Sequence, residues 1–390
     1  MSIRATRARI IASALALASV TAVSGASPAA GHDSAVQLDF IGEQELPNAM
    51  AFQGTTVGGL SAISYDTRTG TYYLISDDRS QTGPARFYSA RVTFGGGHLT
   101  GAELIGTHSW LRPDGTTYPP TSTPAGQPAT VAPDPEGIAV DPSDGSLVWT
   151  SEGERIVPSD GPAVLGDPWI RRATTTGEYS GQLPLPPQLH MNSQAIGPRR
   201  NQTLECVTFT PDGRQLVTAM EDPLYQDGDD PTPDHGALTR ITVHDARTGL
   251  PRAQYAYLLE PLFATPPAGS TDTNGVSDLV ALGDDRFLVL ERASVFSTNT
   301  WKARLYLVDL RGATNVLGRD SLADGPVRPV HKTLVSDLSD ITGLPRVDNV
   351  EGITLGPRLP DGRRTVVLVS DDNFASRQVT QFIAFAADGI

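Results

Sequence analysis

A stretch of sequence with one pattern recurs five times along this chain, and this repeat constrains the fold more than any other feature. Each copy has an apolar run, a turn rich in Gly, Asp or Pro, and a second apolar run that ends on an acid. The copies are about 73 residues apart, and a fixed interval between self-similar units is the signature of a repeat fold. The five copies are SAISYDTRTGTYYLISD, EGIAVDPSDGSLVWTSE, ECVTFTPDGRQLVTAME, DLVALGDDRFLVLE and EGITLGPRLPDGRRTVVLVSD.

Each copy predicts a β-hairpin, because two short runs rich in Val, Ile, Leu, Phe and Tyr flank a turn. Further strand-like runs follow the hairpins, as at 169–176 and 238–248. About four strands per unit is typical of a propeller blade, so we expect an all-β propeller of five four-stranded blades. Six blades is the alternative if a degenerate blade lies within a polar, Pro-rich insert. Those inserts, at 112–135 and 225–236, are otherwise predicted to be surface loops.

The two ends of the repeat region predict that the ring is closed. A strand-like run at 36–46 precedes the first hairpin and has no hairpin of its own, and a last run occupies 381–388. The N-terminal run could complete the last blade as its outer strand and so seal the ring. Because repeat units share their core with their neighbours, we expect residues 31–390 to form a single domain.

Two positions of the repeat are acidic in nearly every copy. The first position opens the copy and holds Ser61, Glu136, Glu205, Asp278 and Glu351. The second position ends the second apolar run and holds Asp77, Glu152, Glu221, Glu291 and Asp371. Acids are 44 of the 390 residues, so chance alone would place about one acid in these ten positions. Acids at nine of them therefore indicate a shared structural or chemical role.

These acids are predicted to gather at one mouth of the central channel. The two ends of an antiparallel hairpin lie together, and the innermost strands of a propeller line its channel. Carboxylates crowded there would repel one another and raise each other's pKa values. A hard cation would relieve this repulsion. Ca²⁺ takes oxygen ligands in flexible geometry, and Asn349 and Asn373 beside the last acids suit the same ligand set.

Other cations and a purely structural role stay open at this point. Mg²⁺ or Mn²⁺ would also suit oxygen ligands, whereas a lone cysteine and histidines without ligand spacing argue against zinc. Acids at repeat positions also cap turns or accept hydrogen bonds from backbone N–H groups, which would make the ring structural only. Arg79 and Arg292 follow acids of the second position. They could bind a phosphate or carboxylate beside the cation, or simply pair with their acidic neighbours.

Residues 1–30 have the features of a secretory signal peptide, with Arg4, Arg7 and Arg9 before a short apolar run and then small residues. That run is too short to span a membrane, and no later stretch is long enough. The formal net charge is −14, and loss of the leader makes it more negative. Such a charge argues against nucleic acid and anionic membranes as partners. We therefore expect a secreted monomer without an anchor, acting on a small molecule.

Other motifs that carry chemistry are missing from the sequence. It has no phosphate loop, no dinucleotide fingerprint, no Gly-x-Ser-x-Gly elbow and no His-Glu-x-x-His. Cys206 is the only cysteine, so no intramolecular disulfide can form. Its place in an expected strand predicts a buried thiol rather than a nucleophile.

The ordered set of repeats resembles the phytase-like domain family, labelled "esterase-like activity of phytase". The resemblance spans about residues 40–388. The segments that carry it are GGLSAISYD with YYLISDDR, DPEGIAVD with TSEG, ECVTFTPDGRQLVTAMED, GVSDLVALGDDRFLVLER, and NVEGITLGP with VLVSDDNF. The resemblance places the family's recurrent acids at Asp77, Asp78, Glu136, Glu152, Glu205, Glu221, Glu291, Glu351, Asp371 and Asp372.

The resemblance implies a hydrolase of phosphate esters or related esters. The plan is also similar to that of calcium-dependent β-propeller phytases, in which an acidic channel holds several Ca²⁺ ions and positions phosphate. This chain differs because only Arg79 and Arg292 are basic near the acids, which argues against phytic acid as the substrate. With a cation present, the two arginines would clamp the phosphoryl group, and Glu136 or Glu205 would orient the water.

The leading prediction is thus a secreted, metal-dependent hydrolase of phosphate esters or phosphodiesters, with Ca²⁺ as the expected cofactor. The alternatives are a lactone or carboxyl-ester hydrolase, and a non-catalytic binding propeller stabilised by Ca²⁺. The metal ligands expected from the repeat and the resemblance together are Asp77, Asp78, Glu136, Glu152, Glu205, Glu221, Asp278, Glu291, Glu351, Asp371 and Asp372.

Overall fold

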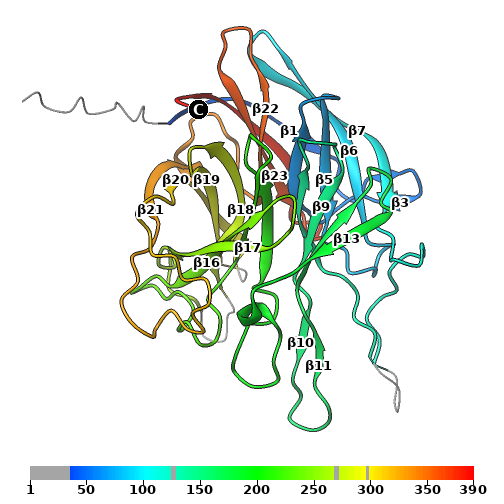
Figure 1. Ribbon diagram of the computed structural model, residues 1–390. Coiled ribbons are helices and arrows are strands. Elements are labelled where there is room, and N and C mark those ends of the chain that lie inside the picture. The colour runs from blue at the N-terminus through cyan, green and yellow to red at the C-terminus, as the bar shows by residue number, and fades with distance from the viewer. Residues whose placement is uncertain (1–35, 124–128, 268–271, 296–297) are drawn as a thin grey trace, which may run out of the picture. The chain divides into compact units, whose positions relative to one another are not determined.

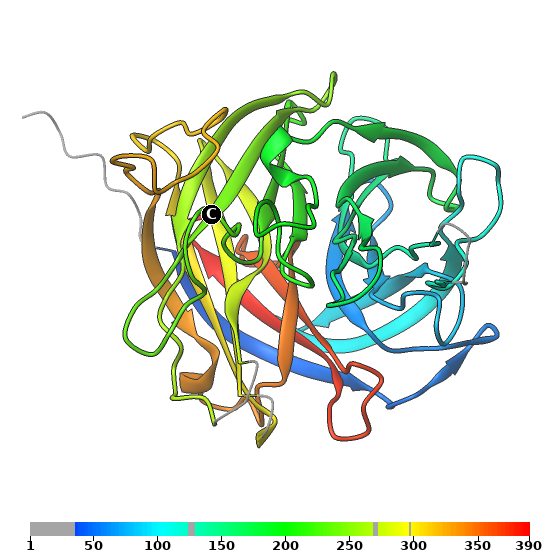
Figure 2. The ribbon, with the colours of Figure 1, turned by 90° about the horizontal axis from the view of Figure 1, so that it is seen from below.

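Five antiparallel sheets of four strands each build the fold, which confirms the predicted five-bladed, all-β propeller. The computed structural model describes residues 36–123, 129–267, 272–295 and 298–390, and these residues form no α-helix. The expected signal peptide at 1–30 lies outside the described residues. In Figure 2 the chain colours follow one another round the ring, from blue to red.

We number the blades in chain order of their innermost strands. Blade 1 contains β4 (Leu60–Asp66), β5 (Thr71–Ser76), β6 (Arg86–Gly95) and β7 (His98–Ser109). Blade 2 contains β8 (Pro135–Val140), β9 (Leu147–Ser151), β12 (Trp169–Ala173) and β13 (Tyr179–Leu183). Blade 3 contains β14 (Leu204–Phe209), β15 (Gln215–Met220), β16 (Leu238–Asp245) and β17 (Pro251–Leu258). Blade 4 contains β18 (Asn274–Gly283), β19 (Arg286–Val295), β20 (Thr300–Asp309) and β21 (His331–Asp337).

Blade 5 joins the two ends of the chain. It contains β22 (Asn349–Arg358), β23 (Arg364–Asp371), β24 (Thr380–Asp388) and, as its outer strand, β1 (Gln37–Leu46). β1 runs antiparallel to β24, with Gln37 opposite Asp388 and Leu46 opposite Thr380. The predicted closure by the N-terminal strand is therefore confirmed, and the blue and red strands lie side by side in Figure 2.

Smaller elements decorate the ring. They are the hairpins β2 (Ala51–Phe52) with β3 (Thr55–Thr56) and β10 (Glu154–Ile156) with β11 (Val164–Gly166), and the short 3₁₀ turns η1 (Pro187–Leu189) and η3 (Leu338–Asp340). The β10–β11 hairpin projects from the lower end of the view in Figure 1. No helix among the described residues is long and apolar enough to cross a membrane.

The hydrophobic core lies between neighbouring blades rather than at the channel. Each innermost strand contacts the innermost strand of the next blade, and β22 of blade 5 contacts β4 of blade 1, so the ring is continuous. One apolar cluster joins Leu74 of β5 to Val367 of β23, and another joins Val148 of β9 to Leu216 of β15. Cys206 is fully buried in the cluster shared by blades 3 and 4, as predicted for a core thiol.

Each innermost strand carries an irregularity near its start, where its pairing skips a residue. The skipped residues are Ser61, Glu136 with Gly137, Glu205, Ser277 and Glu351. A bulge of this kind adds a residue that the ladder does not pair and re-aims its side chain. The first acidic position of the repeat coincides with this bulge in four blades, but in blade 4 the bulge residue is Ser277, one residue before Asp278.

Blade 4 is therefore displaced by one residue from the alignment that the acids suggested. Gly275 pairs with Arg292, just as Asn349 pairs with Asp371 in blade 5. Arg292 thus occupies the second position of the repeat in blade 4, and Glu291 lies one residue before that position. Since successive residues of a strand point to opposite faces, this shift changes which side chains enter the channel.

Candidate functional site

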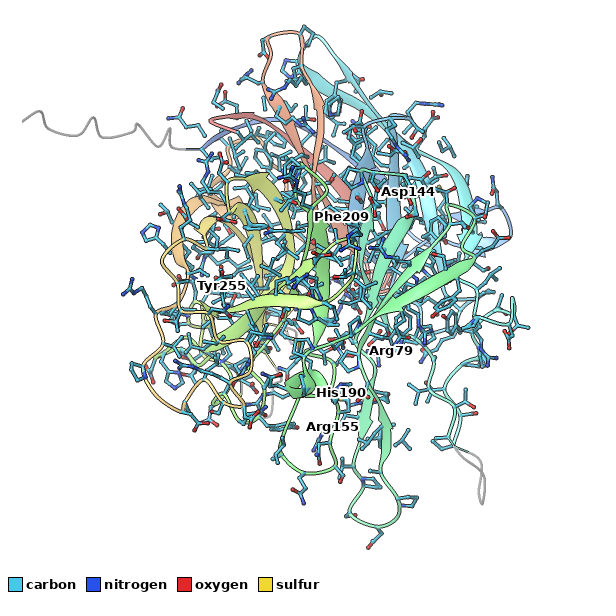
Figure 3. The ribbon with its side chains drawn as sticks, in the orientation of Figure 1. Arg79, Asp144, Arg155, His190, Phe209 and Tyr255 are labelled. Carbon is cyan, nitrogen blue, oxygen red and sulfur yellow. The ribbon has the colours of Figure 1, made fainter. Side chains whose placement is uncertain are left out.

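A cavity of about 680 Å³ lies where the innermost strands begin. Its lining is dominated by charged and amide side chains, and it is open on one side to the loops that join the blades. Arg79, one of the lining residues, lies toward the lower end of the view in Figure 3, and Asp144, in a hairpin turn, lies at the opposite end. The lining residues are Asp77, Arg79, Glu136, Arg200, Asn201, Gln202, Glu205, Glu221, Asp222, Asp230, Pro231, Asp272, Thr273, Arg292, Asn349, Glu351, Asp371 and Asn373.

The bulges and strand ends bring seven of the predicted acids together at the channel mouth. The bulge residues Glu136, Glu205 and Glu351 come from blades 2, 3 and 5. The acids that follow the second strands are Asp77, Glu152, Glu221 and Asp371. Six of the seven are buried and Asp77 is half-buried, and burial raises the pKa of every one of them. The channel mouth is therefore a buried carboxylate cluster, as the repeat predicted.

Two overlapping groups within this cluster have the spacing of a cation site. Asp134, Glu136 and Glu152 each offer an oxygen atom within 4.8 Å of the others. Glu152, Glu205 and Glu221 form a second such group. Glu152 belongs to both, so two cation positions would share one carboxylate. Both groups come from blades 2 and 3, and oxygen-only donors of this kind suit a hard divalent cation.

Burial and mutual repulsion raise the pKa values of these carboxyl groups. Desolvation is the largest cause for Glu136 and Glu205, and it raises the pKa of each well above its usual value. The charge of Glu205 adds to the shift of Glu136, and the charge of Glu221 adds to that of Glu205. Burial likewise raises the pKa of Glu221 to about 7, although the charge of Arg292 opposes it. Without a cation, burial and mutual repulsion thus favour the protonated forms of these groups.

Four buried oxygen atoms of the cluster have no hydrogen-bond partner among the described residues. They are Asp77 Oδ1, Glu152 Oε2, Asp222 Oδ1 and Asn349 Oδ1. A buried acceptor without a partner is costly, and native structures rarely leave several together. Because a divalent cation would satisfy such oxygens at once, their presence supports the fit of a metal ion to these residues.

Arg79 is held at the rim of the cavity by blade 2 rather than by its own neighbours in sequence. Its Nε donates to Asp134 Oδ1 at 2.7 Å, and its guanidinium also contacts Asn201 Oδ1. A second arginine, Arg200, binds Glu154 Oε1 at 2.7 Å, and Glu154 lies 4.0 Å from Arg79. Arg79 thus lies at the acidic mouth, where it was predicted. It is paired with Asp134, and 27% of its side chain remains exposed.

Arg292 lies deeper in the cavity, between acids of blades 3 and 5. Its Nη2 donates to Glu351 Oε1 at 2.9 Å and to Glu221 Oε1 at 3.3 Å. Gly275, opposite Arg292 in the sheet, makes room for the Glu221 side chain, which a Cβ atom at this position would meet. Burial tends to lower the pKa of Arg292, but the surrounding carboxylates outweigh that effect and keep the guanidinium charged.

Two of the predicted metal ligands, Asp78 and Asp372, do not line the cavity. The Asp78 carboxylate accepts hydrogen bonds from the backbone N–H groups of Gln81 and Gly83. It also forms an ion pair with Arg86, with Nη1 at 2.6 Å. These bonds outweigh the effect of burial and lower the pKa of Asp78. Asp372 accepts from the N–H groups of Gly59 and Phe374. Both acids hold loops in place, which is the structural role left open for acids of the repeat.

Asp278 and Glu291 are also outside the cavity, because of the one-residue displacement of blade 4. Asp278 accepts hydrogen bonds from the backbone N–H groups of Leu279 and Ile353, both at 2.8 Å, and so ties blade 4 to blade 5. Glu291 accepts from Tyr257 Oη at 2.6 Å and from Lys332 Nζ at 2.5 Å. Both carboxylates are buried with their partners and have no access to the channel mouth.

The sequence reasoning missed two acids that the fold brings into the cluster. Asp134 lies two residues before the bulge of blade 2, as Asn349 does in blade 5, so the parallel between DPEG and NVEG was an available signal. Asp222 follows Glu221 and receives a hydrogen bond from Gln202 Nε2 at 2.9 Å. In the first and last blades the residue after the second acid turns away from the cavity. Nothing in the sequence alone distinguishes Asp222 from Asp78 and Asp372.

A closed five-bladed ring with a buried carboxylate cluster at one channel mouth defines a β-propeller of the acidic-channel type. The sequence matches the model of the phytase-like family, described as "Esterase-like activity of phytase", over residues 55–374. This match covers most of the chain, so the protein belongs to the phytase-like family. Family membership and fold together support a propeller hydrolase as its broad class. A search of curated proteins finds no match.

Several solved structures share a loose similarity with this chain. An endo-arabinase from Bacteroides thetaiotaomicron VPI-5482 is 12% identical, with 84% of this chain and 93% of that chain covered and a TM-score of 0.39. A β-1,3-galactosidase of glycoside hydrolase family 43, with galactodeoxynojirimycin, is 10% identical, with 87% and 93% covered and a TM-score of 0.43. Similarity at this level says nothing about the reaction of the present protein.

Proposed function

We propose that this protein is a metal-dependent hydrolase of phosphate esters or phosphodiesters, with Ca²⁺ as the cation at the channel mouth. The observation that carries the proposal is the cluster of seven repeat acids at a cavity of about 680 Å³, where several buried oxygen atoms have no partner within the described part of the chain. Such a cluster is stable only with protons or cations among its carboxylates. Oxygen-only donors from loops and strand ends favour Ca²⁺, which accepts varied coordination geometry, over zinc.

The residues that would hold the cation are those of the two overlapping groups in blades 2 and 3. They are Asp134, Glu136, Glu152, Glu205 and Glu221. Asp77 of blade 1 and Asn349 of blade 5 each offer a further oxygen atom that has no partner in the described ranges. When bound, the cation would supply positive charge to the ester oxygens and acidify a water molecule.

The remaining chemistry falls to side chains of the cavity. Arg79 and Arg292 line it and carry fixed positive charges, so either would attract and orient a phosphoryl group. Burial and neighbouring carboxylates raise the pKa values of Glu136 and Glu205 above the usual range of Glu, which favours a carboxyl group that exchanges a proton with water. We assign to one of them the orientation of the attacking water.

The family description favours a second candidate within the same site. Because it names an esterase-like activity, a lactone or carboxyl ester is an alternative substrate that the same cation and carboxylates would serve. A carboxyl ester has no charged phosphoryl group, and so it makes less use of Arg79. Charge reversal at Arg79 therefore separates the two candidates: it should weaken turnover of a phosphate ester far more than that of a neutral ester.

The test is hydrolysis of chromogenic phosphate monoesters, phosphodiesters and carboxyl esters by the purified protein, with Ca²⁺ and after its removal. We expect a phosphate ester or diester to be cleaved, and the rate to fall when Ca²⁺ is removed and recover when it is restored. Secretion of the mature chain is part of the proposal and is tested by locating the protein outside its cell of origin. Binding of Ca²⁺ without hydrolysis of any ester would instead favour the non-catalytic binding propeller.

A further inference from the structure

We propose that Arg292 is a built-in cation that occupies the place a further divalent ion would otherwise fill. This inference rests on the proposed metal site and adds to it a residue that sets how many cations the channel mouth accepts. The starting point is the register of blade 4. Arg292 stands at the chain position where the other four blades carry Asp77, Glu152, Glu221 and Asp371.

The surroundings of Arg292 are those of a bound cation. Its Nη2 lies 2.9 Å from Glu351 Oε1 and 3.3 Å from Glu221 Oε1, and only 10% of its side chain is exposed. Nη1 makes one long contact, 3.4 Å, with Thr273 Oγ1. The guanidinium thus bridges two carboxylates from blades on either side of its own. A divalent ion would do the same, except that the guanidinium cannot dissociate.

The oxygen atoms that such an ion would need are already in place. Asn349 Nδ2 donates to Glu351 Oε1 at 2.9 Å, which holds the amide in one orientation. Its other atom, Asn349 Oδ1, is buried and has no partner among the described residues. Glu221 and Glu351 thus offer carboxylate oxygens at the guanidinium, and Asn349 offers an amide oxygen beside Glu351; these are the kinds of donor that Ca²⁺ uses.

The location of the two groups of acids with cation-binding geometry agrees with this assignment. Among the described residues, those groups come from blades 2 and 3, and neither includes Glu351 or Asp371. Glu351 and Glu221 contact the guanidinium of Arg292, whereas Glu136, Glu152 and Glu205 lie against other carboxylates. Arg292 thus occupies the space between Glu221 and Glu351, so a divalent ion cannot bridge these two carboxylates while the guanidinium is present.

The experiment counts bound Ca²⁺ per chain in the purified protein, by calorimetric titration and by metal analysis after dialysis. The variants are Arg292→Gln, which removes the charge and offers an amide oxygen, and Arg292→Lys, which keeps the charge as a matched control. We expect Arg292→Gln to bind one Ca²⁺ more than the wild type, and Arg292→Lys to match the wild type. Equal numbers in Arg292→Gln and the wild type would overturn the inference and leave the proposed metal site standing.

A second pair of variants keeps the test decisive if Arg292→Gln does not fold. Glu351→Gln and Glu136→Gln each remove one carboxylate from an otherwise unchanged mouth. Because Glu351 pairs with Arg292, its replacement should leave the number of bound Ca²⁺ ions unchanged, whereas the replacement of Glu136 should lower it. A lost ion in Glu351→Gln would overturn the inference. A wild-type protein that binds no Ca²⁺ would overturn the proposed metal site itself.

Discussion

The blade 2 and 3 side of the channel mouth and the blade 4 side use equivalent chain positions with opposite charges. On the first side, Glu152 and Glu221 follow the second strands and lie within 4.8 Å of Glu205. On the other side, the equivalent residue is Arg292, which neutralises Glu351. The comparison teaches that one repeat can place a carboxylate or a cationic side chain at the same position beside buried acids. If Ca²⁺ binds as proposed, the two sides satisfy their carboxylates in two ways, one with an exchangeable cation and one with a covalently attached cation. The two sides should therefore respond differently to mutation, chelation and pH.

The largest expected effect is on catalysis and concerns an acid on the blade 2 and 3 side of the mouth. We expect Glu136→Gln to lower kcat/KM for an ester substrate by roughly 10³-fold, because it removes a carboxylate that binds cation or water. The measurement is initial-rate kinetics at saturating Ca²⁺. The matched control is Asp144→Asn in the hairpin turn of the same blade, at the far end of the strands (Figure 3), which should retain activity. Equal losses in both variants would mean that the acids serve folding alone.

The next effect is on stability and concerns the blade 4 side. Removal of one partner from a buried ion pair leaves an uncompensated charge and typically costs about 3 kcal/mol. We therefore expect Arg292→Gln to lower the free energy of unfolding by about that amount in the absence of divalent cations. Denaturant unfolding in metal-depleted buffer measures it, and Arg292→Lys is the control. A metal-free variant as stable as the wild type would show that Glu221 and Glu351 need no counter-charge.

A somewhat smaller effect is expected from the cation itself on the wild-type protein. Because Ca²⁺ would bind only the folded state, a free concentration one hundred times the dissociation constant should stabilise the fold by about 2.7 kcal/mol. Thermal unfolding with chelator and with added Ca²⁺ measures this gain. The same comparison with Glu136→Gln is the control, since a weakened site should reduce the gain. Identical melting curves with and without Ca²⁺, in protein shown to be metal-free, would contradict the proposal.

The smallest effect is a pH dependence confined to the metal-free protein. The folded-state pKa values of Glu136, Glu205 and Glu221 are raised, to about 7 for Glu221, so these groups favour folding when protonated. Their contribution is complete below the unfolded pKa of 4.5 and is lost as pH rises towards 7 and beyond. We expect stability to fall by up to about 1.4 kcal/mol per pH unit for each group that titrates.

The measurement for this last effect is denaturant unfolding between pH 5 and pH 8, with and without Ca²⁺. Bound Ca²⁺ favours the ionised carboxylates, so it should flatten or reverse the trend. If the metal-free protein instead gains stability over this range, the carboxyl groups of the cluster are ionised and compensated in some other way.

The fold and half of the site followed from the periodicity of the sequence, and the rest did not, for physical reasons. Blade number, ring closure and the convergence of the seven acids depend on strand pattern and topology, which a repeat displays openly. The position of blade 4 depends on a bulge at Ser277, and a bulge moves every later side chain of its strand by one residue. An alignment guided by acids chose Asp278 and Glu291, while GVSD against NVEG would have indicated Ser277 and Arg292.

Other errors arose because one residue type serves two purposes. Asp78 and Asp222 each follow an acid of the second position, yet Asp78 holds a loop and Asp222 lines the cavity. The difference lies in what surrounds them: Arg86 and backbone N–H groups satisfy Asp78 completely. Hydrogen-bond partners that come from another strand or from the backbone of a folded loop leave no recognisable pattern in the sequence around the acid. The same is true of Arg79, whose partner Asp134 belongs to the next blade.

The pairing of β1 with β24 also fixes the order in which the protein can be completed in time. Leu46 and Thr380 pair across almost the whole chain, and contacts between such distant residues form slowly. The seam between blades 5 and 1 brings Asp371 against Asp77, so the acids of the first and last repeats meet only when that seam closes. Until that seam closes, the acids of the first repeat are separated from those of the last. The first strand of the ring to be made has to wait for the last, and the site is whole only once the first and last repeats have met.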